Sequence, residues 1–154
     1  MSALIFVFLL GCVAGLRSLT APAVVCWAAH FGWLHLAGTK LAFMNHPVTL
    51  IIFTVLAAVE LVVDKLPKTP ARTAPTGLIA RVIFGGLSGA AVGAAVGIVP
   101  YLGATVACIG ALVGTFAGYH VRRTLVLRHL PDFSVALTED VIAILGGLLI
   151  TWRI

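Results

Sequence analysis

Charged side chains inside long apolar segments are the residues of this sequence most able to carry chemistry. Arg17 separates two apolar runs, and Glu60 lies near the end of a later apolar segment, one helical turn before Asp64, so both carboxylates share a helix face. A charge at the bilayer centre costs about 2.5–3.5 kcal/mol on insertion scales. Arg17 and Glu60 therefore predict a functional network inside a membrane, whereas Asp64 with Lys65 could also end a helix at the membrane interface.

A second group of charges lies in the later apolar segments. Arg81 lies about one turn inside one segment, and Glu139 and Asp140 follow Thr138 in the last one. Arg81 could instead extend to the lipid phosphates, and the two carboxylates could cap a helix that starts at Thr138. If that helix starts at Ser134, Glu139 lies about 7.5 Å inside it. We expect the arginines to pair with carboxylates, either Arg17 or Arg81 with either Glu60 or Glu139.

The sequence offers no pattern for a catalytic, metal or cofactor site. The histidines lack metal-ligand spacing, and no catalytic Ser/His/Asp order, P-loop or dinucleotide fingerprint occurs. The cysteines lie in apolar runs without paired spacing: Cys12, Cys26 and Cys108. We therefore expect no catalytic residue, no metal and no cofactor, which favours a protein that is not an enzyme without deciding the question.

Composition predicts an all-α, polytopic membrane helix bundle that forms one integral membrane domain over residues 1–154. The chain is 61% hydrophobic and only 10% charged, whereas soluble domains carry about 25% charged residues. Its net charge of +5 is dispersed among loops, so we expect a lipid bilayer and no nucleic acid as partner. About five spans are expected, at residues 3–33, 47–63, 76–99, 102–119 and 134–152.

The first apolar stretch, residues 3–33, is too long for one perpendicular span of about 20 residues. It is interrupted around Arg17 and Pro22, so it forms either one long kinked helix or two half-helices that meet at a polar break. No Lys or Arg precedes it, so we expect a retained helix rather than a cleaved signal peptide. The basic segments 64–75 and 120–133 are expected in the cytoplasm, which places the N-terminus inside for a crossing helix and outside for a hairpin.

Glycines at four-residue spacing form two ladders, which predict glycine-zipper packing. Such a row lets another helix approach closely in lipid. We expect Gly89 and Gly93 to contact another helix backbone, either the second ladder or the same helix of a neighbouring protomer. A weak likeness between residues 14–18 and 85–89 is compatible with a parallel internal repeat or with chance. The ladders are Gly85, Gly89, Gly93 and Gly97, then Gly110, Gly114 and Gly118.

Three parts of the chain carry a family resemblance: residues 15–18 (GLRS), residues 60–67 (ELVVDKLP), and Arg81 with Gly85 and Gly86. Together they resemble an uncharacterised bacterial integral-membrane family catalogued as a domain of unknown function. The Glu-Leu-x-x-Asp-Lys-x-Pro segment is the most specific part. The resemblance implies a small polytopic inner-membrane protein and supplies no activity, substrate or cofactor.

Three functions fit these observations. The first is a small transporter or channel-like protein of the bacterial inner membrane, a homo-oligomer with an anionic or zwitterionic substrate. Its pathway would contain the charged residues Arg17, Glu60, Asp64, Arg81, Glu139 and Asp140. The second is a non-catalytic subunit or assembly factor bound to a larger membrane partner. The third is a lipid-modifying enzyme that acts on phospholipid headgroups.

Overall fold

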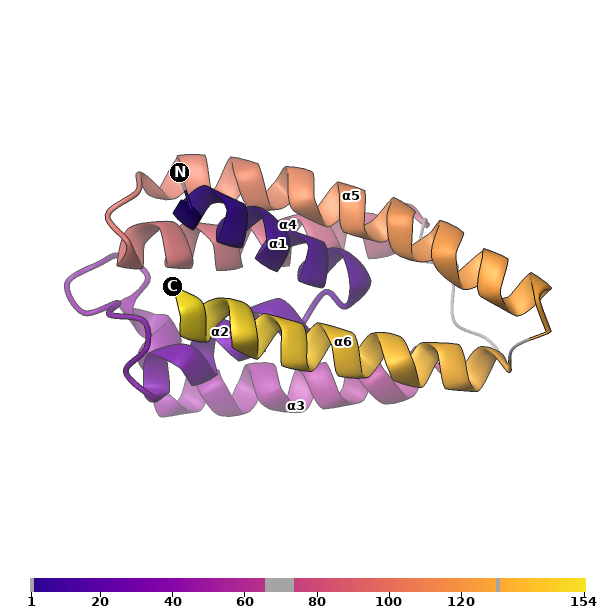
Figure 1. Ribbon diagram of the computed structural model, residues 1–154. Coiled ribbons are helices and arrows are strands. Elements are labelled where there is room, and N and C mark those ends of the chain that lie inside the picture. The colour runs from indigo at the N-terminus through magenta and orange to yellow at the C-terminus, as the bar shows by residue number, and fades with distance from the viewer. Residues whose placement is uncertain (1, 66–73, 130) are drawn as a thin grey trace.

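The computed structural model describes residues 2–65, 74–129 and 131–154, and within them the chain folds into helices with no strand (Figure 1). The predicted all-helical class is confirmed. Three helices, α4 to α6, are long and apolar enough to cross a membrane, and two shorter apolar helices accompany them. The elements are α1 (Ser2–Leu16), α2 (Thr20–His30), the 3-10 helix η1 (Ala42–Asn45), α3 (Pro47–Val63), α4 (Pro75–Ala95), α5 (Pro100–Leu127) and α6 (Asp132–Arg153).

Helices α1 and α2 form a hairpin that turns back at Arg17. The chain therefore has the second of the two expected arrangements, two half-helices that meet at a polar break. Helix α1 runs alongside α5 in the same direction, whereas α2 returns antiparallel to α3. The N- and C-termini consequently lie at the same end of the bundle (Figure 1). The 15 residues of α1 extend about 22 Å, less than the hydrocarbon core of about 30 Å.

Local sequence explains the turn. The backbone N–H of Arg17 closes the last turn of α1 on Val13 O at 2.9 Å, and α2 begins three residues later. Pro22 lies in the first turn of α2, where a missing N–H breaks no helical hydrogen bond. Since α1 and α4 run in opposite directions, the likeness between residues 14–18 and 85–89 does not mark a parallel repeat.

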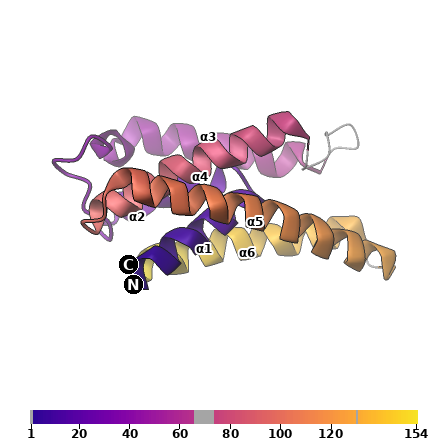
Figure 2. The ribbon, with the colours of Figure 1, turned by 90° about the horizontal axis from the view of Figure 1, so that it is seen from above.

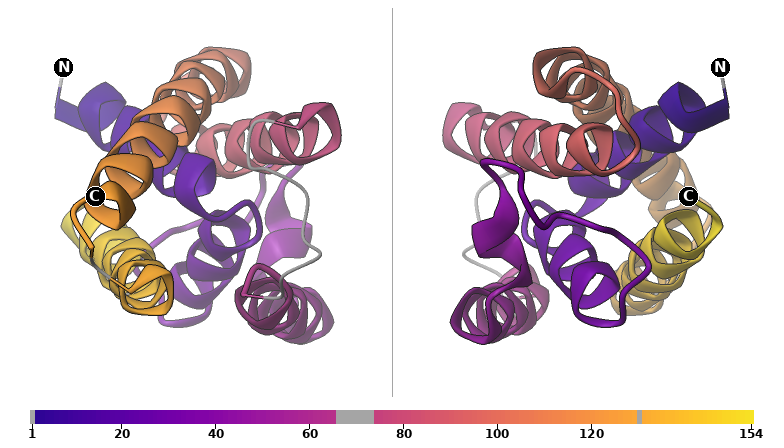
Figure 3. Two further views of the ribbon diagram at one scale, coloured as in Figure 1. Left: turned by 90° about the vertical axis from the view of Figure 1, so that its right-hand side faces the viewer. Right: turned by 90° about the vertical axis from the view of Figure 1, so that its left-hand side faces the viewer.

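Small residues hold α1, α4 and α5 in close contact, and these three helices form one side of the bundle (Figure 3). A Cβ atom added at Gly89 would lie 2.5 Å from Gly103 O, and one added at Gly114 would lie 2.8 Å from Cys12 Cα. Helix α5 thus turns one small-residue face to α4 and another to α1. We expected the second ladder to contact the first one on α4. Instead, Gly110 and Gly114 both pack against α1.

The remaining ladder glycines take different positions. Gly85 lies between the Cβ atoms of Ala14 and Ala111, at 3.2 and 3.1 Å from an added Cβ, and Gly118 is buried in α5. Gly93 has looser contacts, the nearest being Gly103 Cα at 3.4 Å. Gly97 is not part of a packing face, contrary to expectation. Its φ of 73° and the hydrogen bond from Ile98 N–H to Gly93 O at 2.8 Å show a Schellman turn that ends α4.

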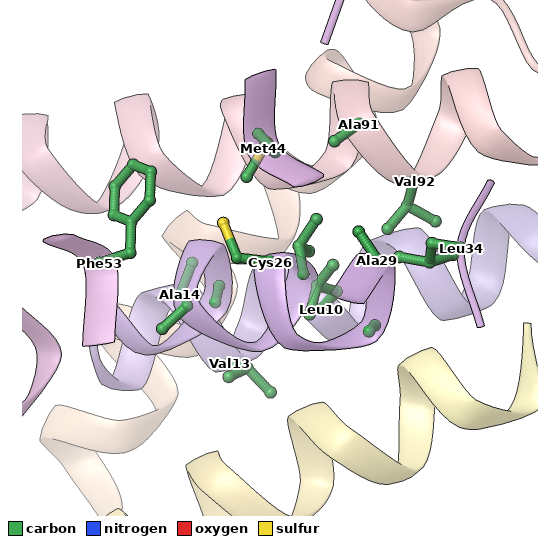
Figure 4. Packing of buried hydrophobic residues seen from close by; sticks show 14 of the residues in the cluster. Leu10, Val13, Ala14, Cys26, Ala29, Leu34, Met44, Phe53, Ala91 and Val92 are labelled. Atoms are coloured by element: carbon green, nitrogen blue, oxygen red, sulfur yellow. The ribbon is translucent and has the colours of Figure 1, made fainter. Parts of the chain in front are cut away.

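Helix α2 is the buried centre of the other side of the bundle, between α3 and α6 (Figure 3). All residues from 20 to 26 are buried. Figure 4 shows Cys26 and Ala29 of α2 near Leu10, Met44 and Val92, which come from three other elements. The buried side of α2 therefore packs against α1, α4 and η1.

Helices α5 and α6 project beyond α3 and α4 at one end of the molecule (Figure 2). The 28 residues of α5 extend about 42 Å, so this helix is longer than a bilayer core. The expected loop at residues 120–133 is mostly helix, because its Leu and Arg residues favour helix, and α5 continues to Leu127. We call this the basic end, defined by Lys65, Arg122, Arg123 and Arg128.

Candidate functional site

The side chains of four charged residues meet at the hairpin tip, and we call them the Arg17 cluster: Arg17, Asp64, Lys65 and Asp140. Arg17 Nε donates to Asp140 Oδ1 at 2.7 Å, Nη2 lies 2.6 Å from the same oxygen, and Nη1 pairs with Asp64. Lys65 Nζ lies 2.6 Å from Asp140 Oδ2. The cluster thus joins the hairpin to α3 and α6, and its two cations balance its two carboxylates.

Burial makes this cluster unusual. The Arg17 side chain is 0% exposed, while those of Asp64 and Asp140 are 17% and 5% exposed. A planar guanidinium can serve two carboxylates at once, which a lysine ammonium cannot do with the same geometry. Removing one partner from a buried ion pair costs about 3–5 kcal/mol, because the remaining charge is left unpaired. Arg17 is therefore stable in this buried position only while it is ion-paired.

Glu60 does not pair with Arg17, contrary to one expected arrangement. Its Oε1 accepts from Ser18 N–H at 2.8 Å and from the Ser18 hydroxyl, and its Oε2 accepts from Leu19 N–H at 2.8 Å. These donors lie just before the first turn of α2, where the helix dipole favours negative charge. Glu60 of α3 therefore caps a helix from another part of the chain and fixes the direction in which α2 starts.

A second ion-pair group lies nearer the tip of the α5–α6 extension. Arg122 donates two hydrogen bonds to Asp132, at 2.8 and 2.7 Å, and its Nη1 lies 3.7 Å from Glu139 Oε2. Because α6 begins at Asp132, Glu139 and Asp140 lie inside the helix, and the alternative that they cap it is wrong. Glu139 is thus brought close to Arg122.

Arg81 lies in the second turn of α4 and is 5% exposed. It is therefore inside the bundle, which does not fit the alternative in which it extends to the lipid phosphates. Of the six charged residues expected in the pathway, Arg17, Asp64 and Asp140 meet in one cluster, whereas Glu60 and Glu139 have other partners.

Sequence reasoning missed four residues that complete these groups: Ser18, Lys65, Arg122 and Asp132. Lys65 directly follows Asp64, and a lysine beside a buried carboxylate was a usable signal. The role of Ser18 had no comparable signal, since its acceptor Glu60 lies 42 positions away in the sequence. Within the described ranges, no group of three His, Cys, Asp or Glu residues is arranged to hold a metal ion.

We expect Glu60→Gln to lower the free energy of unfolding by about 2 kcal/mol, because an amide replaces a charged acceptor and turns its NH2 group towards backbone donors. Thermal unfolding in detergent measures this loss. Ser18→Ala is the matched comparison, since it removes one of the three hydrogen bonds and leaves the carboxylate in place. A Glu60→Gln loss no larger than that of Ser18→Ala would contradict the capping role.

Comparison with known proteins identifies the family of this chain but assigns it no activity. A family model described as Domain of unknown function (DUF4126) matches residues 4–151. Neither the search of curated proteins nor the search of solved structures gave a match. Because the matched region covers almost the whole sequence of 154 residues, the chain belongs to the DUF4126 family.

Proposed function

We propose that this protein is a small multi-pass transporter of the bacterial inner membrane, in which the α1–α2 hairpin is the moving element. The observation that carries the proposal is the fully buried Arg17 at the break of a discontinuous helix, ion-paired with α3 and α6. Discontinuous helices that place charges near helix ends are a recurrent way to build transporter sites.

Energetics support a functional role for this cluster over a purely structural one. Replacing a buried ion pair by packed apolar residues is often neutral or stabilising in proteins, so stability alone does not require one. Ionisable residues within a membrane domain are expensive and mark ion or substrate pathways by default. The Arg17 cluster therefore acts as a closed gate, whose ion pairs must separate before the hairpin tip moves away from α3 and α6.

The chemistry of the cluster favours a small anionic or zwitterionic substrate. A carboxylate or phosphate can replace Asp64 or Asp140 on the Arg17 guanidinium, whose forked N–H donors suit both groups. A released aspartate can then take up a proton, which couples substrate movement to proton movement. In this scheme Asp64 is the more accessible carboxylate of the gate, because its side chain is 17% exposed and that of Asp140 is 5% exposed.

The proposal also covers the orientation of the protein in the membrane and its oligomeric state. The basic end faces the cytoplasm by the positive-inside rule, so both termini face the opposite side. The outer face of α3 carries exposed apolar residues such as Ile51, Val55 and Val62. This face contacts lipid or a second copy in a homo-oligomer.

We expect Asp140→Asn to lower flux in proteoliposomes about tenfold or more, since an amide cannot take up the proton that a released aspartate carries in this scheme; a tenfold loss corresponds to about 1.4 kcal/mol in the limiting step. The assay follows protons together with chloride, phosphate or glycine as probes. Asp132→Asn is the matched control on the same helix, because the Asp132 side chain is 60% exposed. Size-exclusion profiles verify that both variants remain folded.

An unchanged flux in folded Asp140→Asn protein would remove the cluster from transport. No flux in the wild type with any probe, together with a stoichiometric larger partner in native membranes, would support the alternative of a non-catalytic subunit. That alternative is favoured by one observation, the complete charge balance within the Arg17 cluster, which a structural lock also requires.

A further inference from the structure

An apolar groove of about 400 Å³ lies along α2 between α3 and α6. It begins near the hairpin tip at Thr20, Leu61 and Ile144, and continues towards the opposite end at Trp27 and Phe31. Thr20 and Phe31 are 11 positions apart along α2, so the groove spans about 16 Å. This length and its mostly aliphatic walls fit one hydrocarbon chain.

One buried polar group in the wall is unsatisfied. Thr20 is 3% exposed, and its hydroxyl has no hydrogen-bond partner among the described residues. The other hydroxyl in the groove is fully used, since Thr54 Oγ1 donates to Leu50 O and accepts from Trp27 Nε1. A buried hydroxyl without a partner costs free energy. An occupant with an oxygen acceptor at this depth would satisfy the Thr20 hydroxyl once the side chain turns it towards the groove.

Lys65 lies at the end of the groove near the hairpin tip and indicates the chemistry of the occupant's headgroup. Leu61 and Ile144 lie one helical turn from Lys65 and Asp140, respectively, and Lys65 Nζ donates to Leu61 O at 3.1 Å. The Lys65 side chain is 22% exposed. Its ammonium has three donors, of which two bind Leu61 O and Asp140 Oδ2. The third N–H donor of this ammonium remains available to the phosphate of an anionic headgroup.

We propose that the groove binds one acyl chain of an anionic phospholipid from the leaflet at the basic end. The phosphate lies at Lys65, an ester carbonyl accepts from the Thr20 hydroxyl, and the chain follows α2 towards Trp27. This order of headgroup, ester and chain matches the order of the three features along the groove. The proposal does not depend on transport, because it concerns lipid held beside the Arg17 cluster.

Fluorescence quenching of Trp27 tests this proposal. The chain has three tryptophans, so Trp33→Phe with Trp152→Phe leaves Trp27 alone. The protein is reconstituted in vesicles of phosphatidylcholine with increasing fractions of phosphatidylglycerol brominated on its acyl chains, or of brominated phosphatidylcholine. We expect half-maximal quenching at about a fivefold lower fraction of the anionic lipid, as one basic residue near the surface contributes.

Variants separate a specific site from ordinary lipid contact. Lys65→Gln should abolish the preference for the anionic lipid, and Thr20→Val should weaken quenching by both lipids. Thr151→Val is the matched control for Thr20→Val, because the buried Thr151 hydroxyl already donates to Gly147 O and lies outside the groove. Ala58→Phe, at an exposed groove position, should fill the groove and reduce quenching without disturbing the core.

Several results would overturn the proposal. One is equal quenching by the two lipids in the wild type, or a preference that survives Lys65→Gln. Another is quenching that Ala58→Phe leaves unchanged. A third is a Trp27 that neither lipid quenches while crosslinking shows α3 or α6 of a second copy over the groove, since the occupant would then be protein.

Discussion

Arg17→Gln should destabilise the protein by about 3–5 kcal/mol, the cost of breaking a buried ion pair from one side. Glutamine retains part of the volume but none of the charge, so Asp64 loses its partner and Asp140 retains only Lys65. Thermal unfolding in detergent, followed by size exclusion and circular dichroism, measures the loss. Arg17→Lys should restore only part of it, because an ammonium lacks the fork that bridges two carboxylates.

A double variant separates lost charge from lost packing. Asp64→Asn in the Arg17→Gln background removes the unpaired carboxylate, so we expect the double variant to be more stable than Arg17→Gln alone. If the two losses simply add, Asp64 is not the residue that Arg17 neutralises. The same result would remove the basis of the proposed gate.

Gly114→Ala should cost about 3 kcal/mol, near the upper end for overpacking. A Cβ atom at this position would lie 2.8 Å from Cys12 Cα and 2.9 Å from Cys12 C. Backbone atoms cannot rotate away as a side chain can, so α1 would have to shift from α5. Since α1 leads directly into the hairpin tip, the shift should also disturb the Arg17 cluster. Detergent stability and flux should fall together.

Gly146→Ala is the matched control, since a Cβ atom added there meets nothing within 4 Å. It should be neutral or slightly stabilising, because Ala favours helix over Gly. Gly93→Ala should also be tolerated, as its nearest contact is 3.4 Å. Equal losses for Gly114→Ala and Gly146→Ala would show that α1 and α5 are not packed backbone to backbone.

The sequence was sufficient to locate the break at Arg17 but not to choose between a kinked helix and a hairpin. Residues 3–33 are long enough for either arrangement. The choice depends on contacts far apart in the chain, chiefly Gly11 and Gly15 against α5 and the capping of α2 by Glu60. None of these contacts leaves a local pattern in the sequence.

The sequence also could not predict which charged residues pair with one another in the site. Spacing correctly placed Glu60 and Asp64 on one helix face, but it could not show that Glu60 is closer to the start of α2 and Asp64 closer to Arg17. Asp140 and Glu139 are neighbours in sequence, yet only the rotation of α6 directs Asp140 to Arg17 and Glu139 to Arg122. The glycine ladders likewise predicted close packing but not which helix each ladder meets.

The hairpin is the central claim, and the sidedness of single cysteines tests it most directly. The three native cysteines are first replaced by alanine: Cys12, Cys26 and Cys108. Ala3→Cys, His35→Cys and Arg128→Cys are then introduced one at a time, and oriented membrane vesicles are treated with a membrane-impermeant maleimide. A hairpin predicts that the Ala3→Cys and His35→Cys variants react from one side and Arg128→Cys from the other. Reaction of Ala3→Cys from the same side as Arg128→Cys would show that the first helix crosses the membrane and would contradict the account.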